Sequence, residues 1–268
     1  MINKNKNPIG VFDSGVGGLS VLKELIKELP NEHFIYFGDT QRVPYGEKSI
    51  DELLTCTRRI LDYFKTRDVK AVVVACNTCS ANTITQVKDE YDFEILGLIE
   101  PAAKYVCSFD INSVGLIATS ATVKSNAYKN EIEKKGIKVF QQSCPKLVKY
   151  VEAGKITGRE VENVLKEYLS PLIENKIEKL ILGCTHYPFL VPAIKKLGFE
   201  NEFFINPAVC VSAKTKEFLI ENKLLNRNGE GLQEFYVSGN PNDFKKHSKL
   251  FFNKIKNVEQ ILNEESYV

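Results

Sequence analysis

The sequence contains no apolar run that approaches the roughly 20 residues a helix needs to cross a bilayer. Its charges nearly cancel, with 36 basic and 34 acidic side chains and a formal net charge of +2. So small an excess gives no reason to expect nucleic acid or an anionic membrane as the main partner. Residues 1–7 contain no apolar stretch and lead into a strand-like segment, so no secretory signal is expected there.

Few histidines and an odd number of cysteines limit the metal and disulfide chemistry. The chain has three scattered histidines and seven cysteines. A chain of 268 residues does not need covalent cross-links, so the cysteines predict free thiols in a reducing cytoplasm. Residues 76–79 form a C-x-x-C motif, but the sequence shows neither further zinc ligands at close spacing nor the thioredoxin-like context of a redox pair. No bound metal is therefore expected.

Short apolar runs alternate with helical patterns along the chain. Residues 22–29 carry apolar side chains at helical spacing, and Pro30 ends that helix. Ser49 and Glu52 form a capping-box signal that opens the next helix. The predicted strands are 9–12, 33–37, 71–75, 113–118, 138–142, 179–182 and 234–237. Because these strands are apolar throughout and are separated by helices, we expect an α/β fold with mostly parallel sheets covered on both faces.

The two halves of the chain show a faint internal repeat. Cys76 follows the glycine that opens segment 10–14 by 66 residues, and Cys184 follows the glycine that opens segment 115–119 by 69 residues. In each half the cysteine ends an apolar run and precedes a polar residue able to cap a helix. The repeat predicts two similar, pseudo-symmetric α/β domains with a ligand cleft between the carboxyl ends of their strands. Chance similarity is the alternative.

Cys76 and Cys184 are the leading candidates for chemistry. The positive end of a helix dipole lowers the pKa of a thiol from about 8.5 and makes thiolate available near neutral pH. The alternative is a small buried apolar side chain, which is what most free cysteines are. The matched strand-end positions favour a functional role for these two, whereas Cys56 and Cys107 lie inside helical patterns and are expected to pack.

A glycine-rich turn, 13–18, follows the first predicted strand. One interpretation is the phosphate-binding loop of a dinucleotide site, with Asp39 as the ribose-binding acid, although Ser20 stands where the last glycine or alanine is expected. Asp13, immediately before the glycines, would repel a pyrophosphate and suits an ammonium group better. A tight turn that needs glycine explains the segment at least as well.

Three further side chains have both a structural and a functional interpretation. Pro44 and Gly46 fix a turn in which Tyr45 either faces a cleft or covers the edge of the sheet. His186 either caps a helix or holds a substrate carboxylate and tunes the nearby thiol. Glu152, near the end of a predicted helix, is most simply a surface residue.

Taken together, several segments resemble the glutamate racemase family, within the wider aspartate/glutamate racemase group. They are GVFDSGVGG at 10–18, FGDT at 37–40 with PYG at 44–46, ACNT at 75–78, and LGCTHYP at 182–188. They occur in the family's order, and the resemblance extends over nearly the whole chain. Each motif alone is modest, but the ordered set is highly specific.

The resemblance implies two similar α/β domains with the active site in the cleft between them. The first domain comprises 1–97 plus 209–268, and the second, 98–208, is inserted into it. Cys76 and Cys184 match the paired catalytic thiols of the family. The implied substrate-binding positions are Asp13, Ser14, Tyr45, Gly46, Asn77, Thr78, Thr185 and His186. The implied accessory positions are Asp39, Glu152, Thr119 and Thr122.

Two positions depart from the family's pattern. Cys79 stands where relatives more often have alanine, and it is easily mistaken for a catalytic residue. Segment 118–122 reads ATSAT in place of the more usual Gly-Thr pattern. This departure weakens the expectation that Thr119 and Thr122 contact the substrate carboxylate.

The implied reaction is the cofactor-independent interconversion of L-glutamate and D-glutamate. One thiol removes the α-proton from one face, and the other delivers a proton to the opposite face. The resemblance implies a bacterial cytoplasmic enzyme that supplies D-glutamate for peptidoglycan synthesis. No lysine motif of a pyridoxal phosphate enzyme is evident, so no cofactor is expected, and a homodimer is the candidate assembly. The rival interpretations are an aspartate or related racemase, an NAD-type oxidoreductase and a non-enzymatic amino-acid-binding module.

Overall fold

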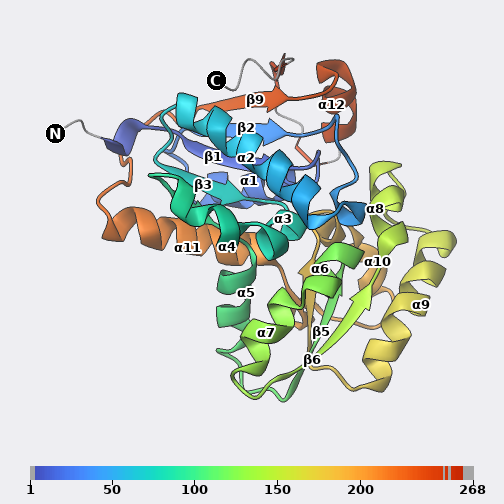
Figure 1. Cartoon of the computed structure of the whole chain (residues 1–268). Coiled ribbons are helices and arrows are strands. Elements are labelled where there is room, and N and C mark those ends of the chain that lie inside the picture. The colour runs from blue at the N-terminus through green and yellow to red at the C-terminus, as the bar shows by residue number, and fades with distance from the viewer. Residues whose placement is uncertain (1–3, 250, 253–254, 262–268) are drawn as a thin grey trace.

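The computed structural model describes residues 4–249, 251–252 and 255–261. Its strands form two separate sheets, which lie in two lobes (Figure 1). The first sheet has the order β10-β9-β2-β1-β3-β4, and the second has the order β6-β5-β7-β8. The strands are β1 (Ile9–Asp13), β2 (Phe34–Gly38), β3 (Ala71–Val74), β4 (Glu94–Leu96), β5 (Ser113–Ala118), β6 (Lys138–Ser143), β7 (Lys179–Gly183), β8 (Phe204–Ile205), β9 (Gln233–Val237) and β10 (Glu259–Gln260).

Every strand pair in these sheets is parallel. Parallel neighbours need a crossover connection, so helices join the strands and cover the sheet faces. The α-helices are α1 (Leu19–Glu28), α2 (Ile50–Thr66), α3 (Asn77–Asn82), α4 (Ile84–Val87), α5 (Ile99–Val106), α6 (Ser120–Ser125), α7 (Ala127–Glu133), α8 (Pro145–Glu152), α9 (Arg159–Glu174), α10 (Val191–Lys195), α11 (Pro207–Glu221) and α12 (Pro241–Ser248). Short 3₁₀ helices lie at Lys4–Lys6, Tyr45–Glu47, Lys88–Glu90, Tyr187–Leu190 and Asn201–Phe203. The α/β fold with parallel sheets is thereby confirmed.

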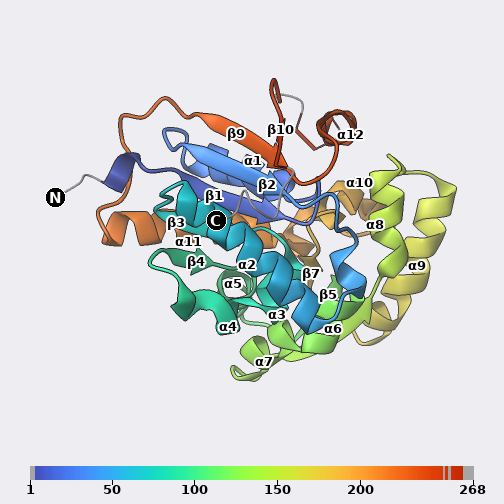
Figure 2. The same cartoon turned by 45° about the horizontal axis from the view of Figure 1, so that its top comes forward.

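Both faces of the first sheet are buried, as its continuous apolar strands predict. Ile9 and Val11 of β1 belong to the core that includes α1, whereas Phe12 belongs to the opposite core beneath α2. Successive side chains of a strand point to opposite faces, so one strand supplies both cores. Figure 2 shows the sheet between these helices. The second sheet is covered in the same way, by α5 and α7 on one face and by α8 and α9 on the other.

The local signals in the sequence predict these elements well. Each of the seven predicted strands is present, with ends that differ by at most one residue. The capping box is formed, since the Ser49 hydroxyl accepts from the Glu52 amide and the Ser49 amide donates to the Glu52 carboxylate at 2.9 Å. The sequence did not predict β4, β8 and β10, because two or three residues are too few to show an apolar run.

The chain leaves the first sheet and later returns to it. The strands of the first sheet come from 9–96 and 233–260, and those of the second come from 113–205. This order fits an inserted second domain, and the boundaries at 97/98 and 208/209 stay a prediction. Parts of the predicted first domain, namely 1–3, 250, 253–254 and 262–268, lie outside the described residues. None of the helices in the described ranges combines the length and the apolarity that crossing a membrane requires.

Candidate active site

The carboxyl ends of both sheets meet around one cavity of about 240 Å³. Ligands of open α/β sheets bind at this end of the strands, so it is the expected place for a site. The lining comes from both lobes and includes both candidate thiols. It consists of Asp13, Ser14, Val43, Pro44, Tyr45, Gly46, Glu47, Cys76, Asn77, Thr78, Thr119, Ser120, Pro145, Val148, Lys149, Glu152, Cys184, Thr185 and His186. Of the site residues the sequence predicted, Asp39 and Thr122 lie outside this lining.

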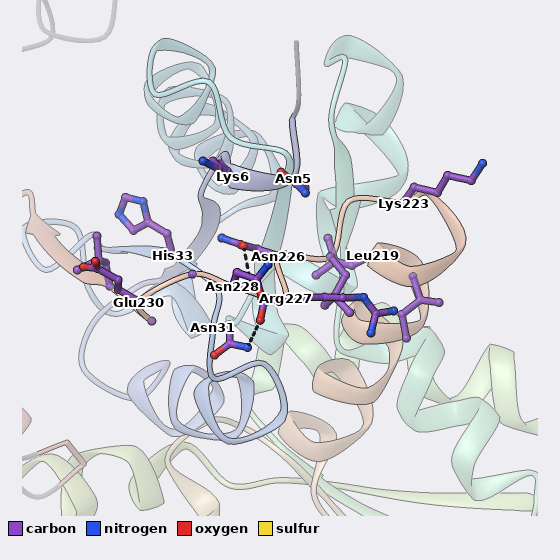
Figure 3. Close-up of a pocket in the computed structure, with 15 residues that line it drawn as sticks. Asn5, Lys6, Asn31, His33, Leu219, Lys223, Asn226, Arg227, Asn228 and Glu230 are labelled. Carbon is purple, nitrogen blue, oxygen red and sulfur yellow. Dashed lines mark hydrogen bonds between the residues drawn. The ribbon is translucent and has the colours of Figure 1, made fainter. Parts of the chain in front are cut away.

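A larger hollow, about 770 Å³, lies at the opposite end of the first sheet (Figure 3). Much of its lining comes from residues that precede β1, β2 and β9 in the chain, so the hollow lies beside the amino ends of these strands. Side-chain amides surround it, and the Asn31 amide donates to the backbone carbonyl of Arg227 at 2.7 Å. Its lining has no cysteine, and none of the site residues that the sequence predicted lies in it.

The two candidate thiols are nearly buried in equivalent places. Cys76 follows β3 and is the N-cap of α3, and only 5% of its surface is exposed. Cys184 follows β7 and is 6% exposed. The halves differ in what comes next, because Cys184 is followed by a four-residue 3₁₀ helix with His186 as its N-cap. Of the two thiols, Cys76 therefore lies at the start of a short α-helix, whereas Cys184 has a histidine beside it.

The glycine-rich turn folds around the Asp13 carboxylate. Oδ2 of Asp13 accepts from the amide of Gly18 at 2.9 Å and from the amide of Gly15 at 3.2 Å. Burial raises the pKa of Asp13, against the lowering effects of His186 and of these amides. Because the amides that would hold a pyrophosphate are turned to this carboxylate, the dinucleotide interpretation of the turn is not supported.

The same turn joins the two lobes. A side chain at Gly17 would collide with Thr185 and His186, and one at Gly18 would collide with Asp13. The hydroxyl of Ser20 donates to the backbone carbonyl of Thr185 at 2.9 Å. Glycine is thus needed where the second lobe approaches the turn. Ser20 adds a hydrogen bond between the lobes, and the sequence analysis did not predict this contact.

We expect Gly17→Ala to lower kcat/KM for the racemisation that the sequence resemblance implies by about 10²-fold, because a displacement of about 1 Å in a site has effects of that size. The added methyl group would push Thr185 and His186 away from the cavity. Gly15→Ala is the matched control, since its Cβ would meet only Val43 at the ordinary contact distance of 3.5 Å. Equal activity of the two variants in steady-state assays would contradict the proposed contact.

His186 lies between a thiol and a carboxylate. Its Nδ1 is 3.7 Å from Sγ of Cys184, and its Nε2 is 3.4 Å from Oε1 of Glu152. Nε2 is buried and lacks a hydrogen bond with good geometry among the described residues. Burial lowers the pKa of His186, but Cys184, Glu152 and Asp13 outweigh it and raise that pKa to about 10. The ring is therefore an imidazolium at neutral pH, and it lies beside the Cys184 thiol.

The stability of the fold should depend on pH through this histidine. Its folded pKa of about 10 exceeds the unfolded value of about 6.5, so its stabilisation is complete below pH 6.5 and is lost as the pH rises toward 10. Glu152→Gln removes one cause of the raised pKa. We expect the difference in unfolding free energy between the parent and this variant to shrink from pH 6.5 to pH 10 in urea titrations. A difference that grows with pH would overturn the assignment.

Asp39 supports the loop above the cavity and does not face it. Its Oδ2 accepts from the Tyr45 hydroxyl at 2.5 Å, and its Oδ1 accepts from Arg42 at 2.9 Å. Tyr45 is 2% exposed, so its hydroxyl is directed into the protein. Gly46 packs against Thr119 of the other lobe, which a Cβ would approach within 3.1 Å. Asp39 thus holds the loop that covers the cavity.

A chain of threonine hydroxyls crosses between the lobes. Oγ1 of Thr78 lies 3.0 Å from Oγ1 of Thr119, which lies 3.0 Å from Oγ1 of Thr122. Thr119 is also the N-cap of α6. Thr119 reaches the cavity, whereas Thr122 is fully buried behind it. Thr122 therefore orients Thr119 in the structure.

Tyr128 is a site residue that the sequence analysis missed. It is fully buried in α7, and its hydroxyl donates to Oδ1 of Asn77 at 2.7 Å. Burial raises the pKa of Tyr128 well above its usual range, so the phenol stays a donor. With Oδ1 occupied, the amide group of Asn77 is left to donate into the cavity. In the sequence, Tyr128 looks like an ordinary apolar position of a helix, and no local signal marks it.

Tyr128→Phe should therefore lower kcat/KM about 3- to 10-fold, as expected for the loss of one neutral hydrogen bond. The effect should lie mainly in KM, because Asn77 would bind substrate less well in the ground state and the transition state alike. Tyr105→Phe is the control, since Tyr105 is 49% exposed and lies outside the cavity. An unchanged KM in the first variant would show that Asn77 needs no such support.

The described residues contain no group of three or more histidine, cysteine or acidic side chains placed to hold a metal ion. What they do provide is two thiols, an imidazolium and a buried carboxylate around one small cavity. These groups are suited to moving protons to and from a small polar molecule.

Comparison with known proteins agrees with this chemistry. The profile of the Asp/Glu/hydantoin racemase family matches residues 9–202. The chain is 40% identical to the glutamate racemase of Thermoanaerobacter pseudethanolicus, over 95% of this chain and 97% of that protein. It is 43% identical to the glutamate racemase of Carboxydothermus hydrogenoformans, over 94% and 95%. The crystal structure of glutamate racemase from Francisella tularensis in complex with D-glutamate aligns with a TM-score of 0.91 at 38% identity, covering 98% of this chain and 100% of that one.

Proposed function

The chain belongs to the glutamate racemases of the Asp/Glu/hydantoin racemase family and interconverts L-glutamate and D-glutamate, and we propose that Cys76 and Cys184 transfer the protons. One observation carries this proposal. The two thiols come from different lobes, at the ends of β3 and β7, and line the same small cavity. A molecule bound between the lobes would have one thiol on each side.

Racemisation needs a base on one face of Cα and an acid on the other. In one direction a thiolate removes the α-proton and the opposite thiol donates a proton to the planar carbanion. In the reverse direction the two exchange roles. The His186 ring lies beside the Cys184 thiol, with 3.7 Å between Nδ1 and Sγ. Strand β1, which ends at Asp13, pairs with β3, the strand that precedes Cys76.

The carbanion is the high-energy species, and polar groups of the cavity would stabilise it. We propose that Asn77, Thr78 and Thr185 donate to the substrate carboxylate, where negative charge develops. Asp13 and Ser14, on the glycine-rich turn, would hold the ammonium group. Tyr45 and Gly46 would close the cavity from the loop above, and Glu152 would act through His186. Every proton step is assigned to a side chain, so we propose that no cofactor takes part.

The deciding experiment is incubation of the purified, reduced protein with L-glutamate in D₂O, with no cofactor added. We expect loss of optical rotation, measured by polarimetry, and incorporation of deuterium at Cα, measured by NMR. D-glutamate as the starting substrate should show the same two changes. L-aspartate is the control substrate and should show neither change. Absence of both changes from a folded, reduced sample would refute the proposed chemistry. Deuterium incorporation with L-aspartate as well would refute only the specificity for glutamate.

The cellular setting follows from the family. We propose that the D-glutamate made here supplies peptidoglycan synthesis in the cytoplasm. The homodimer also stays a proposal, which sedimentation of the purified chain tests directly.

A further inference from the structure

The C-x-x-C motif spans the junction between a strand and a helix, and the structure shows which helical positions its two cysteines occupy. Strand β3 ends at Val74, Cys76 is the N-cap of α3, and Cys79 is the third residue of that helix. A strand of a parallel sheet thus leads directly into a helix that begins with two cysteines. This is the setting in which C-x-x-C pairs undergo thiol–disulfide chemistry.

Side chains at the N-cap and at the third helical position face each other. The same chain shows this at α2, where Ser49 and Glu52 occupy these two positions and their side chains bond at 2.8 Å. The Cys76 side chain makes no capping hydrogen bond to the helix, so its sulfur is not held elsewhere by the backbone. Burial raises the pKa of the Cys79 thiol, and a contact with Cys76 raises it further. The two sulfurs are therefore neighbours.

The two thiols differ in what can reach them. Cys76 lines the cavity, whereas Cys79 is fully buried in the core beneath α2. A small oxidant that enters the substrate cavity meets Cys76 first. Cys79 is shielded from solvent but lies next to Cys76, which is the arrangement of an attacked cysteine and a resolving cysteine.

We propose that Cys76 and Cys79 form a site of reversible oxidation by hydrogen peroxide. The Cys76 thiolate attacks the peroxide, the O–O bond breaks, and sulfenic acid forms with release of hydroxide. The Cys79 sulfur then displaces water from this sulfenic acid, with loss of its thiol proton, and an S–S bond forms. In sum, two thiols are oxidised by two electrons and one peroxide is reduced to two waters.

The disulfide leaves Cys76 with no proton to give or accept, so racemisation stops until a thiol reductant restores it. This consequence for activity rests on the proposed role of Cys76, but formation of the disulfide does not. Cys184 has no cysteine within the same turn, and its neighbour is His186. The thiol of the buried Cys144 donates to the backbone carbonyl of Gln142 at 3.5 Å. The switch therefore belongs to the first lobe.

The test uses the full-length protein, reduced and then treated with hydrogen peroxide, with remaining thiols alkylated before digestion by trypsin. Cleavage after Lys70 and Lys88 yields one peptide, 71–88, that holds Cys76, Cys79 and no other cysteine. We expect this peptide to lose the mass of two hydrogens and to escape alkylation, in step with the loss of racemase activity. Dithiothreitol should restore both the mass and the activity, and saturating D-glutamate should slow the oxidation.

Cys79→Ala is the diagnostic variant, because Cys79 does not line the cavity. It should keep its activity before oxidation. After peroxide, its peptide should gain two oxygens at Cys76, and its activity should not return with dithiothreitol, since sulfinic acid is not reduced by thiols. Cys56→Ala, another buried cysteine of the first lobe, is the control and should behave as the parent.

Three results would overturn the proposal. They are full alkylation of peptide 71–88 after peroxide inactivation, a disulfide to a different cysteine, and recovery of Cys79→Ala equal to that of the parent. A disulfide in this peptide without any change of racemase activity would uphold the oxidation site and refute the catalytic role of Cys76. Because the peptide mass does not depend on racemisation, the two failures are distinguishable.

Discussion

Replacing Cys76 or Cys184 with alanine should abolish racemisation, with a loss in kcat of at least about 10³-fold, the scale of a missing acid or base. Each variant keeps one thiol on one side of the cavity. The remaining thiol still removes the α-proton of the one enantiomer whose α-proton points toward it. It then returns a solvent-derived proton to the same face of Cα. Each variant should therefore exchange deuterium into one enantiomer only, without inverting it.

The two variants should be complementary in this exchange. If Cys76→Ala labels one enantiomer in D₂O, Cys184→Ala should label the other, as measured by NMR on each pure enantiomer. Cys107→Ala is the control, since Cys107 lies at the end of α5 and does not line the cavity. Full racemase activity of either catalytic variant in both directions would end the two-thiol account. Labelling of the same enantiomer by both would show that the thiols do not flank Cα.

Breaking the buried ion pair between Lys70 and Glu32 should destabilise the fold by about 3–5 kcal/mol, the range for removing one partner of such a pair. Both side chains are fully buried, and Nζ of Lys70 lies 2.5 Å from Oε2 of Glu32. The same Nζ donates to the backbone carbonyls of Asn5 and Leu224, and Oε1 of Glu32 accepts from the amide of Asn226. One ion pair therefore ties together four distant segments.

Glu32→Gln and Lys70→Met should each lower the free energy of unfolding, measured by urea titration at pH 7. Burial lowers the pKa of Lys70 against the effect of Glu32, so loss of the carboxylate leaves a cation with no compensating charge. Glu90→Gln is the control, because the Arg58–Glu90 pair is 43% and 40% exposed and such pairs contribute about 1 kcal/mol or less. If Glu32→Gln lowers the free energy of unfolding no more than Glu90→Gln does, the buried pair contributes no more to stability than an exposed pair.

Both of these sites lie at ends of the same parallel sheet, and the direction of its strands separates their roles. Cys76 lies at the carboxyl end, where the cavity opens, and Lys70 lies just before β3 at the amino end. Asn226 and Asn5 also line the large hollow at the amino end (Figure 3). The Lys70 and Glu32 variants should therefore change stability with little change in KM, because they touch no residue of the substrate cavity.

The sequence by itself determined the elements and the identity of the candidate thiols. Apolar runs, helical spacing and the Ser49–Glu52 capping box are local signals, carried by residues that are neighbours in the chain. They predicted the parallel α/β fold and placed Cys76 and Cys184 at strand ends. The ordered motifs also indicated the family, because their spacing along the chain is itself a sequence property.

Tertiary structure decided what each of these residues contacts. Ser20 and Thr185 are 165 positions apart, and Tyr128 and Asn77 are 51 apart, yet each pair is hydrogen-bonded. The glycines of the turn proved to surround Asp13, and Cys79 proved to lie behind Cys76 at the start of a helix. Such contacts depend on how whole sheets and helices pack. A pattern within one segment of the sequence carries no information about which distant segment packs against it.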